Sequence, residues 1–248
     1  MDWRENDGVP VLEARLPNAV ALFTTRVGGV SEGPFDSLNL GLLTDDEADR
    51  VHENRRRVAA AAETSTDRIV IGHQIHGTDV LAQGEPPRPS PFADGVAAPR
   101  SDGQIATGDA TVPLVMVADC LPVAVSGPGG VAMLHCGWRG LAGGIIDRGV
   151  RAVDAQAAAV GPGIGPCCYE VGPEVLDAFA DLGAGIANGR MLDLRAVATR
   201  LLEAAGVGAV EVSELCTSCN RDLFFSHRRD RGRTGRQAGL VRLSQGAG

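Results

Sequence analysis

The sequence predicts a mixed α/β fold, of the α+β kind rather than a doubly wound sheet, with mixed sheets flanked by helices. The length of 248 residues favours one globular domain. Apolar runs of strand length alternate with segments of helical composition in no regular order. No internal repeat or linker divides the chain, so residues 1–248 are expected to form a single domain.

The first half of the chain is expected to contain few regular elements. Residues 19–25 indicate a strand, and residues 26–41, with four glycines and a proline, indicate a long loop of the kind that is often functional. Residues 46–63 predict a helix, because acidic residues precede basic ones as the helix dipole favours. Residues 68–72 form a short apolar run, and residues 82–110 predict loops with short strands.

The second half predicts a denser set of elements. Residues 111–118, 121–126 and 131–135 are apolar runs that indicate three successive buried strands. Three helices and two closing strands are expected to follow: helices at 141–158, 173–181 and 192–205, and strands at 208–213 and 238–243.

Charge and composition exclude several classes of protein. The net charge is −8, which argues against nucleic acid as a partner because phosphate backbones need a positive field. No apolar run approaches the roughly 18 residues of a membrane span, and no signal-like segment opens the sequence. We therefore expect a cytoplasmic protein, whose six cysteines are thiols or ligands rather than disulfides.

Polar residues at the ends of three consecutive predicted elements suggest a shared site. Asp119 and Cys120 interrupt two apolar strands, His135 ends the next one, and Arg139 lies in the glycine-containing turn after it. Taken alone, Cys120 could equally be a buried thiol. An acid between two hydrophobic runs must be satisfied or functional, and neighbouring strand ends lie close in space.

His73 and His76 add candidate ligands from the segment after the run at 68–72. Their spacing places both on one face only in a helix, which is not predicted here, so at most one is expected to bind metal. Either could instead be an ordinary hydrogen-bonded histidine. Three nitrogen or sulfur ligands with one open position are typical of catalytic zinc.

The remaining cysteines show no complete motif. Cys216 and Cys219 form a C-x-x-C pair, but the second pair that a zinc ribbon needs is not recognisable. Structural metal binding or a redox role is possible there, although we expect neither. Cys136, Cys167 and Cys168 are expected to be buried thiols.

Seven motifs in order resemble the YfiH/laccase-domain family, over about residues 19–243. They are T-T-R-V-G-G-V-S with F-D-S-L-N-L-G (24–41), H-Q-I-H-G (73–77), S-D-G (101–103), A-D-C-L-P-V (118–123), H-C-G-W-R-G (135–140), G-P-G-I-G-P-C-C-Y-E-V (161–171) and F-S-H-R-R-D with T-G-R (225–236). The family is also called polyphenol oxidase, purine nucleoside phosphorylase or peptidoglycan editing factor.

The resemblance implies a single α/β fold with one zinc ion on His76, Cys120 and His135, copper being the other metal considered. It implies a purine nucleoside phosphorylase acting on adenosine, inosine or methylthioadenosine, with adenosine deamination as a further activity. Copper-dependent oxidation of phenols and editing of cell-wall precursors are the alternatives. Five histidines are too few for a multicopper centre, so we favour the nucleoside activity.

Phosphorolysis requires a phosphate pocket, and arginine is suited to bidentate phosphate binding. Asp119 is expected to orient the ligands or to act as a base. Arg139, at a predicted helix N-terminus, is expected to be catalytic and is also a candidate for the phosphate pocket. Arg228 and Arg229 belong to a basic stretch that could also be a solvated loop. The residues expected to bind phosphate or substrate are Arg26, Ser31, Asn39, His73, Arg228 and Arg229. The expected partners are a purine nucleoside and phosphate, without nucleic acid or membrane, and one compact domain is consistent with a monomer.

Overall fold

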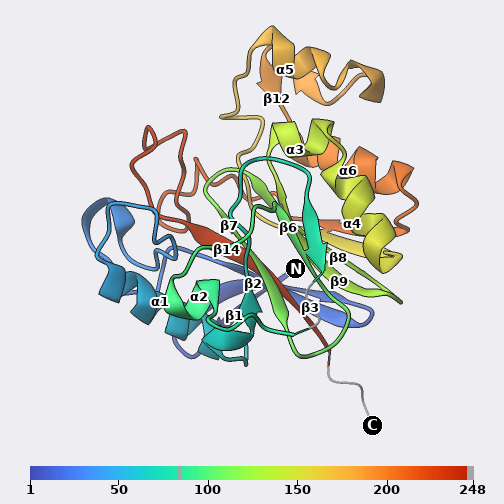
Figure 1. Cartoon of the computed structure of the whole chain (residues 1–248). Helices are drawn as coiled ribbons and strands as arrows, with labels where there is room; N and C mark the ends of the chain where they lie inside the picture. Colours follow the sequence, from blue (N-terminus) through green and yellow to red (C-terminus); the bar gives the residue numbers. More distant parts are fainter. Residues whose placement is uncertain (83–84, 245–248) are drawn as a thin grey trace.

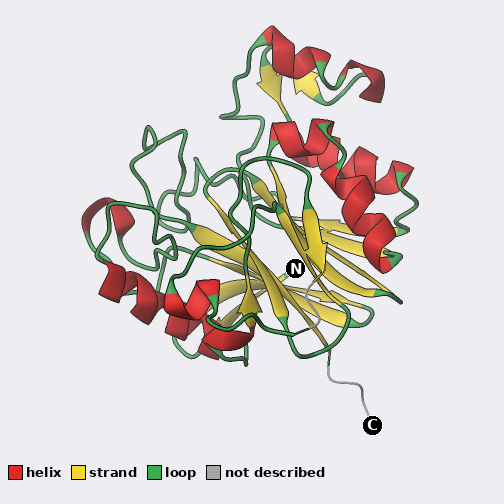
Figure 2. Ribbon diagram, in the orientation of Figure 1, coloured by secondary structure: helices red, strands yellow, loops and turns green. Residues whose placement is uncertain are grey.

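The computed structural model describes residues 1–82 and 85–244. Two six-stranded sheets lie face to face at its centre, and helices cover the outer side of each, as Figures 1 and 2 show. The mixed α/β fold with mixed sheets between helices is therefore confirmed. No helix in the described part of the chain has the length and apolar character needed to cross a membrane.

The first sheet pairs the two ends of the chain. Its strands in spatial order are β1 (Asp2–Asn6), β2 (Val9–Leu16), β3 (Ala19–Thr24), β14 (Gln237–Leu243), β7 (Val112–Val117) and β4 (Ile69–Val70). All neighbours are antiparallel except β4 and β7. The hairpin before β2 was not predicted. Asp7 and Gly8 both have positive φ (47° and 76°) in its turn, the conformation that Asp-Gly turns favour between strands.

The second sheet carries most of the predicted apolar strands. In spatial order it contains β13 (Ala209–Val212), β10 (Ala157–Val160), β8 (Leu121–Gly127), β9 (Gly130–Cys136), β6 (Gly103–Ala106) and β5 (Val80–Ala82). A separate two-stranded ribbon consists of β11 (Ala187–Asn188) and β12 (Met191–Leu192).

The helices are short and lie on the outer faces. They are α1 (Ala48–Ala61), α2 (Pro91–Asp94), α3 (Trp138–Ala142), α4 (Ile145–Val153), α5 (Pro173–Asp177) and α6 (Leu194–Ala204), with 3-10 turns at Gly33–Phe35, Thr66–Arg68 and Ala180–Leu182. The helix predicted over 141–158 is wrong in its C-terminal part. Asp154 ends α4 in the left-handed conformation, and the alanines after it form β10 between β8 and β13. Pairing in the sheet overrides the helical propensity of alanine there.

Alternation along the strands divides the core into three clusters. Phe23 of β3 and Met133 of β9 belong to the cluster between the two sheets. Leu22, next to Phe23, points the other way into the cluster under α1 and α2. Leu134, next to Met133, packs into the cluster under α3, α4 and α6. Because successive side chains of a strand point to opposite faces, both sheets have two buried faces. Polar functional side chains are therefore expected at the strand ends and in the loops.

Candidate metal centre and its cavity

Two histidines and one cysteine converge at the ends of strands. His135 lies near the end of β9, Cys120 lies in the turn between β7 and β8, and His76 lies in the loop after β4. Their ligand atoms all lie within 4.8 Å of one another. The imidazole rings of His76 and His135 meet edge to face with their centroids 4.9 Å apart. Together the three residues form a cluster that can hold a metal ion.

Two residues in or next to the cluster have an uncommon backbone conformation. His76 has φ 60° and Asp119 has φ 96°, both in the region that residues with a Cβ rarely occupy. Hydrogen bonds hold these conformations: the N–H of His76 donates to Asp102 (2.9 Å), and the Asp119 carboxylate accepts from Thr217 Oγ1 (2.6 Å). Local strain of this kind is concentrated at functional sites.

Asp102 is a site residue that sequence reasoning missed. Its fully buried carboxylate lies 2.8 Å from Nδ1 of His135 and also accepts the N–H groups of Ile75 (3.1 Å) and Gly77 (2.7 Å). Burial raises the pKa of this carboxyl, but the hydrogen bonds from His135 and the backbone outweigh it and lower the pKa. In the sequence, Asp102 appears only as part of the motif S-D-G at 101–103, and the position of that motif along the chain does not indicate a role for the aspartate.

Charge in the cluster favours a thiolate. Burial raises the pKa of Cys120, but the nearby His135 and His76 outweigh it and bring the pKa to about 6. Burial lowers the pKa of His135, whereas Cys120 and Asp102 raise it to about 9. In the metal-free protein the pair is therefore a thiolate beside an imidazolium at neutral pH, and the thiolate is the form of cysteine that binds metals.

Gly137 allows the ligands to approach one another. A Cβ at this position would lie 3.0 Å from Sγ of Cys120 and 3.1 Å from Cδ2 of His76. Its φ of −80° is accessible to any residue, so the need for glycine here comes from space and not from backbone conformation.

A cavity of about 850 Å³ opens onto the cluster. This volume lies within the roughly 300–1,000 Å³ typical of small-molecule sites. All three cluster residues line it. Four further residues that the sequence analysis assigned to the site also line it: His73, Asp119, Arg139 and Arg228.

Two arginine–aromatic pairs line the same cavity. The guanidinium carbon of Arg139 lies 4.3 Å from the ring centroid of Trp138, and that of Arg228 lies 5.1 Å from the ring centroid of Tyr169. Burial first, then the negative charge of Cys120, raises the pKa of Tyr169 to about 12. The phenol therefore stays protonated at neutral pH and can donate a hydrogen bond.

Arg26 and Arg229 do not line the cavity, although we expected both to bind phosphate. Nε of Arg26 donates to the carbonyl of Asp36 (2.5 Å), and its guanidinium stacks on Phe225. Arg229 donates to the carbonyls of Thr217 (2.8 Å) and Phe224 (3.0 Å). Both guanidinium groups are engaged in holding loops together.

Ser31 and Asn39 are also outside the cavity lining. Both are buried, at 3% and 0% exposure. Oγ of Ser31 accepts a hydrogen bond from Asn54 (2.8 Å). The Asn39 side chain donates to Thr44 (2.9 Å) and accepts from the N–H of Arg236 (2.9 Å). These side chains stabilise the glycine-rich loop, and we do not carry them into the proposed site.

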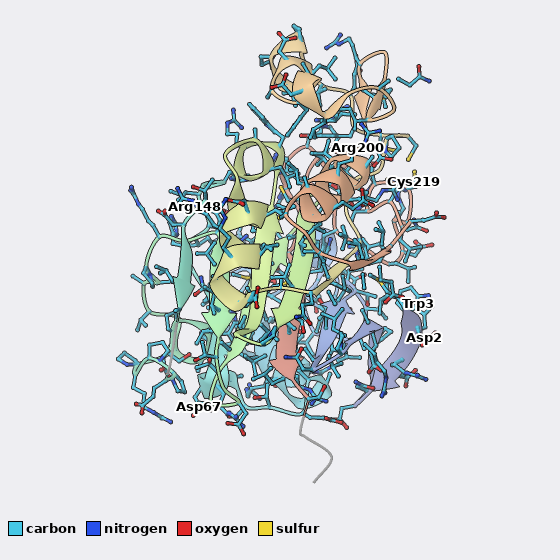
Figure 3. All side chains as sticks on the ribbon, turned by 90° about the vertical axis from the view of Figure 1, so that its right-hand side faces the viewer. Asp2, Trp3, Asp67, Arg148, Arg200 and Cys219 are labelled. Atoms are coloured by element: carbon cyan, nitrogen blue, oxygen red, sulfur yellow. The ribbon has the colours of Figure 1, made fainter. Side chains whose placement is uncertain are left out.

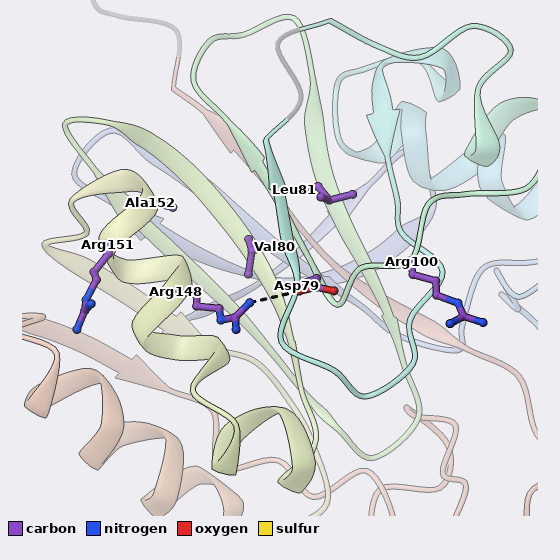
Figure 4. A pocket seen from close by; sticks show the side chains of 7 residues that line it. All are labelled: Asp79, Val80, Leu81, Arg100, Arg148, Arg151 and Ala152. Atoms are coloured by element: carbon purple, nitrogen blue, oxygen red, sulfur yellow. Dashed lines mark hydrogen bonds and ion pairs between the residues drawn. The ribbon is translucent and has the colours of Figure 1, made fainter.

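A second cavity, of about 540 Å³, lies beside β5 and α4 (Figure 4). Arg148 crosses it to Asp79, with Nη1 and Oδ1 3.2 Å apart, while Arg151 points away on the same helix. No histidine or cysteine is among its lining residues. The chemistry of the cluster thus belongs to the larger cavity.

A sequence profile of the family described as "Multi-copper polyphenol oxidoreductase laccase" matches residues 20–244. The chain belongs to this laccase-domain family. The resemblance expected from the seven motifs is thereby confirmed over almost the same range.

Proteins with sequences similar to this chain are named purine nucleoside phosphorylases and not laccases. Purine nucleoside phosphorylase YlmD of Geobacillus stearothermophilus is 39% identical over 246 residues, covering 90% of this chain and 89% of the relative. Purine nucleoside phosphorylase YfiH of Escherichia coli K12 is 38% identical over 237 residues, covering 90% and 93%. The crystal structure of Geobacillus YlmD matches with a TM-score of 0.84 at 37% identity, covering 92% of this chain and 93% of that one.

Proposed function

We propose that this protein is a zinc-dependent purine nucleoside phosphorylase that cleaves adenosine, inosine or methylthioadenosine with phosphate. One observation carries the proposal: a single cavity joins the His76, Cys120 and His135 cluster to two arginine–aromatic pairs. Relatives named purine nucleoside phosphorylase at 35–39% identity support the same activity.

The cluster fits zinc in its donors and surroundings. Within residues 1–82 and 85–244, the cluster consists of two imidazoles and one thiolate, and no further histidine, cysteine or carboxylate belongs to it, which is the pattern of catalytic zinc. Asp102 engages Nδ1 of His135 and leaves Nε2 for the metal. Zinc held by these residues supplies a Lewis acid at the cavity wall.

The aromatic rings and arginines match the two parts of the substrates. The rings of Trp138 and Tyr169 line the cavity and offer aromatic contact surfaces to a purine base. Arg139 and Arg228 are exposed. Nη1 of Arg228 donates to the carbonyl of Glu170 (2.8 Å), so Nε and Nη2 form the edge of that guanidinium that can bind phosphate bidentately. His73 lines the same cavity and adds an imidazole donor or acceptor.

We assign Asp119 a positioning role. Its Oδ1 accepts from Thr217 (2.6 Å) and its Oδ2 accepts from the N–H of Arg228 (2.7 Å). With both oxygens engaged, the carboxylate is better placed to hold Cys120 and the Arg228 loop than to remove a proton from a substrate.

Copper on the same three residues, with phenol oxidation, is the activity that the family's description favours. Several coppers would require several more histidine ligands. Among the histidines in residues 1–82 and 85–244, only His76 and His135 belong to a cluster of metal-binding side chains, and the other such cluster consists of cysteines. The ligand set therefore supports a mononuclear site.

We also propose that the protein acts in the cytoplasm as a monomer. All six cysteines are free, which is typical of a reducing compartment. The metal cluster and the cavity are both built from a single chain.

The test is chromatography of zinc-loaded protein incubated with adenosine, with and without phosphate. Adenine release that requires phosphate supports the proposal. Inosine formed equally with and without phosphate would indicate deamination and remove phosphate binding from the roles of Arg139 and Arg228. Neither product, together with oxygen consumption on phenols by copper-loaded protein, would favour the oxidase.

A further inference from the structure

A second cluster of metal-binding side chains lies outside the cavity. Its Sγ atoms, from Cys167, Cys168, Cys216 and Cys219, all lie within 4.8 Å of one another. Sγ of Cys219 lies 3.4 Å from Sγ of both Cys167 and Cys168. Figure 3 places Cys219 near the surface of the molecule, below the segment that carries α5.

The spacing of the sulfur atoms suits one tetrahedral metal ion. Zinc–sulfur bonds of about 2.3 Å in a tetrahedron place sulfur atoms about 3.8 Å apart. The four cysteines come from two turns, one after β10 and one after β13. An isolated bridge between Gly163 and Cys216 and a hydrogen bond from the N–H of Thr217 to the carbonyl of Gly163 (3.0 Å) hold these turns side by side.

Backbone N–H groups point at one of the sulfur atoms. The N–H of Gly165 donates to Sγ of Cys216 at 3.2 Å, and the N–H of Cys219 donates to the same atom. Donors aimed at a cysteine sulfur stabilise a thiolate, which is the form that a metal binds.

The four sulfur atoms lie close together without being bonded to one another. Four thiolates this close repel one another strongly unless a positive ion lies between them. A divalent metal removes that repulsion and satisfies all four sulfur atoms at once.

We propose that Cys167, Cys168, Cys216 and Cys219 bind a structural zinc ion, closed by four thiolates and separate from the cluster in the cavity. Cysteine-only sets of four are typical of structural zinc, which leaves no position for a substrate. On binding, the thiols that are protonated in the metal-free protein lose their protons to solvent. The assignment is independent of the reaction proposed above.

The four cysteines adjoin residues that form one wall of the larger cavity. Tyr169 follows Cys168 directly and lines the cavity. Thr217 follows Cys216 directly and donates to Asp119, beside the ligand Cys120. Zinc at the four cysteines therefore clamps together the two turns that position one wall of the cavity.

The test uses the full-length His76→Ala variant, in which the cavity cluster is incomplete. Metal-free protein is titrated with Co²⁺ under anaerobic, reducing conditions, and bound zinc is measured separately by elemental analysis. Four thiolates give Co²⁺ intense visible bands and strong near-ultraviolet charge transfer, well above what one thiolate gives. We expect this spectrum to saturate at one equivalent per chain, and we expect one equivalent of zinc.

Single substitutions assign the ligands. Cys219→Ser and Cys167→Ser change exposed positions, and each should abolish the four-thiolate spectrum while circular dichroism confirms folding. Ser218→Ala, in the same turn but not a ligand, should leave the spectrum unchanged. Absence of the four-thiolate spectrum from reduced His76→Ala protein would overturn the proposal. So would disulfides among the four cysteines in protein purified without added oxidant.

Discussion

The carboxylate of Asp102 lies 2.8 Å from Nδ1 of His135 and 2.9 Å from the backbone nitrogen of His76. A single buried side chain thus orients two of the three residues of the metal cluster, one through its ring and one through its backbone. Partners of this kind fix the tautomer of a ligating histidine and raise its basicity.

Asp102→Asn should lower zinc affinity by about 10- to 100-fold, because the amide cannot stabilise the His135 ring as a carboxylate does. Competition with a chromophoric chelator measures the change. Asp79→Asn is the matched control, because Asp79 lies near the same loop but is exposed. Equal affinities in the Asp102 variant and the wild type would show that His135 does not need this partner.

Gly137→Ala should weaken metal binding with little effect on folding. The new Cβ would lie 3.0 Å from Sγ of Cys120 and 3.1 Å from the His76 ring, so one ligand must move. Gly108→Ala is the control, since a Cβ at Gly108 meets nothing within 4 Å. Calorimetric zinc titrations of both variants measure the effect, and unchanged binding by the Gly137 variant would mean that the ligands tolerate the displacement.

Alkylation of Cys120 in metal-free protein should titrate with a midpoint near pH 6. The lowered pKa means that Cys120 remains a thiolate, and so remains reactive, down to about pH 6, and that the rate falls below that pH. Peptide mapping after iodoacetamide treatment measures the rate at each pH. The buried Cys136, whose pKa burial raises well above the ordinary value, serves as the unreactive internal control.

His135→Ala should move that midpoint upward, because the imidazolium no longer favours the thiolate while burial still opposes it. A wild-type midpoint near the ordinary thiol value of about 8.5 would contradict the proposed ion pair.

Arg139→Ala and Arg228→Ala should each raise the KM for phosphate about tenfold or more, since a hydrogen bond to a charged group contributes about 1.5–3 kcal/mol. Steady-state phosphorolysis at varied phosphate measures this. Arg148→Ala, in the smaller cavity, is the control and should leave KM unchanged. If both cavity variants keep the wild-type KM, phosphate binds elsewhere.

Several features of the fold follow from local sequence alone. The runs at 111–118, 121–126 and 131–135 became β7, β8 and β9, because apolar runs of strand length have few other stable arrangements. The end of the helix predicted over 141–158 is wrong, because Ala157 and Ala158 belong to β10. Its alanines favour a helix locally, and only pairing with β8 and β13 makes it a strand.

The candidate site was predictable where its residues end consecutive strands, as Cys120 and His135 do. Contacts between distant segments were not. Asp102 reaches His135 across 33 positions, and Cys167 meets Cys219 across 52. No spacing rule connects such residues, so the sequence showed only an incomplete cysteine motif. The expectation that Cys167 and Cys168 are buried is also wrong, since Cys167 is exposed and Cys168 is half-buried. Arginine's chemistry likewise suggested phosphate for Arg26, although tertiary contacts direct its guanidinium to loop carbonyls.

The most direct test of the central claim is adenine release from adenosine and phosphate by chelator-treated protein, before and after zinc is restored, in the wild type and in His76→Ala. We predict that the treated wild type is inactive and recovers with zinc, and that the variant does not recover. Phosphate-dependent adenine release by metal-free wild type, or equal activity in the zinc-restored variant, would contradict the assignment of His76, Cys120 and His135 as the reaction centre.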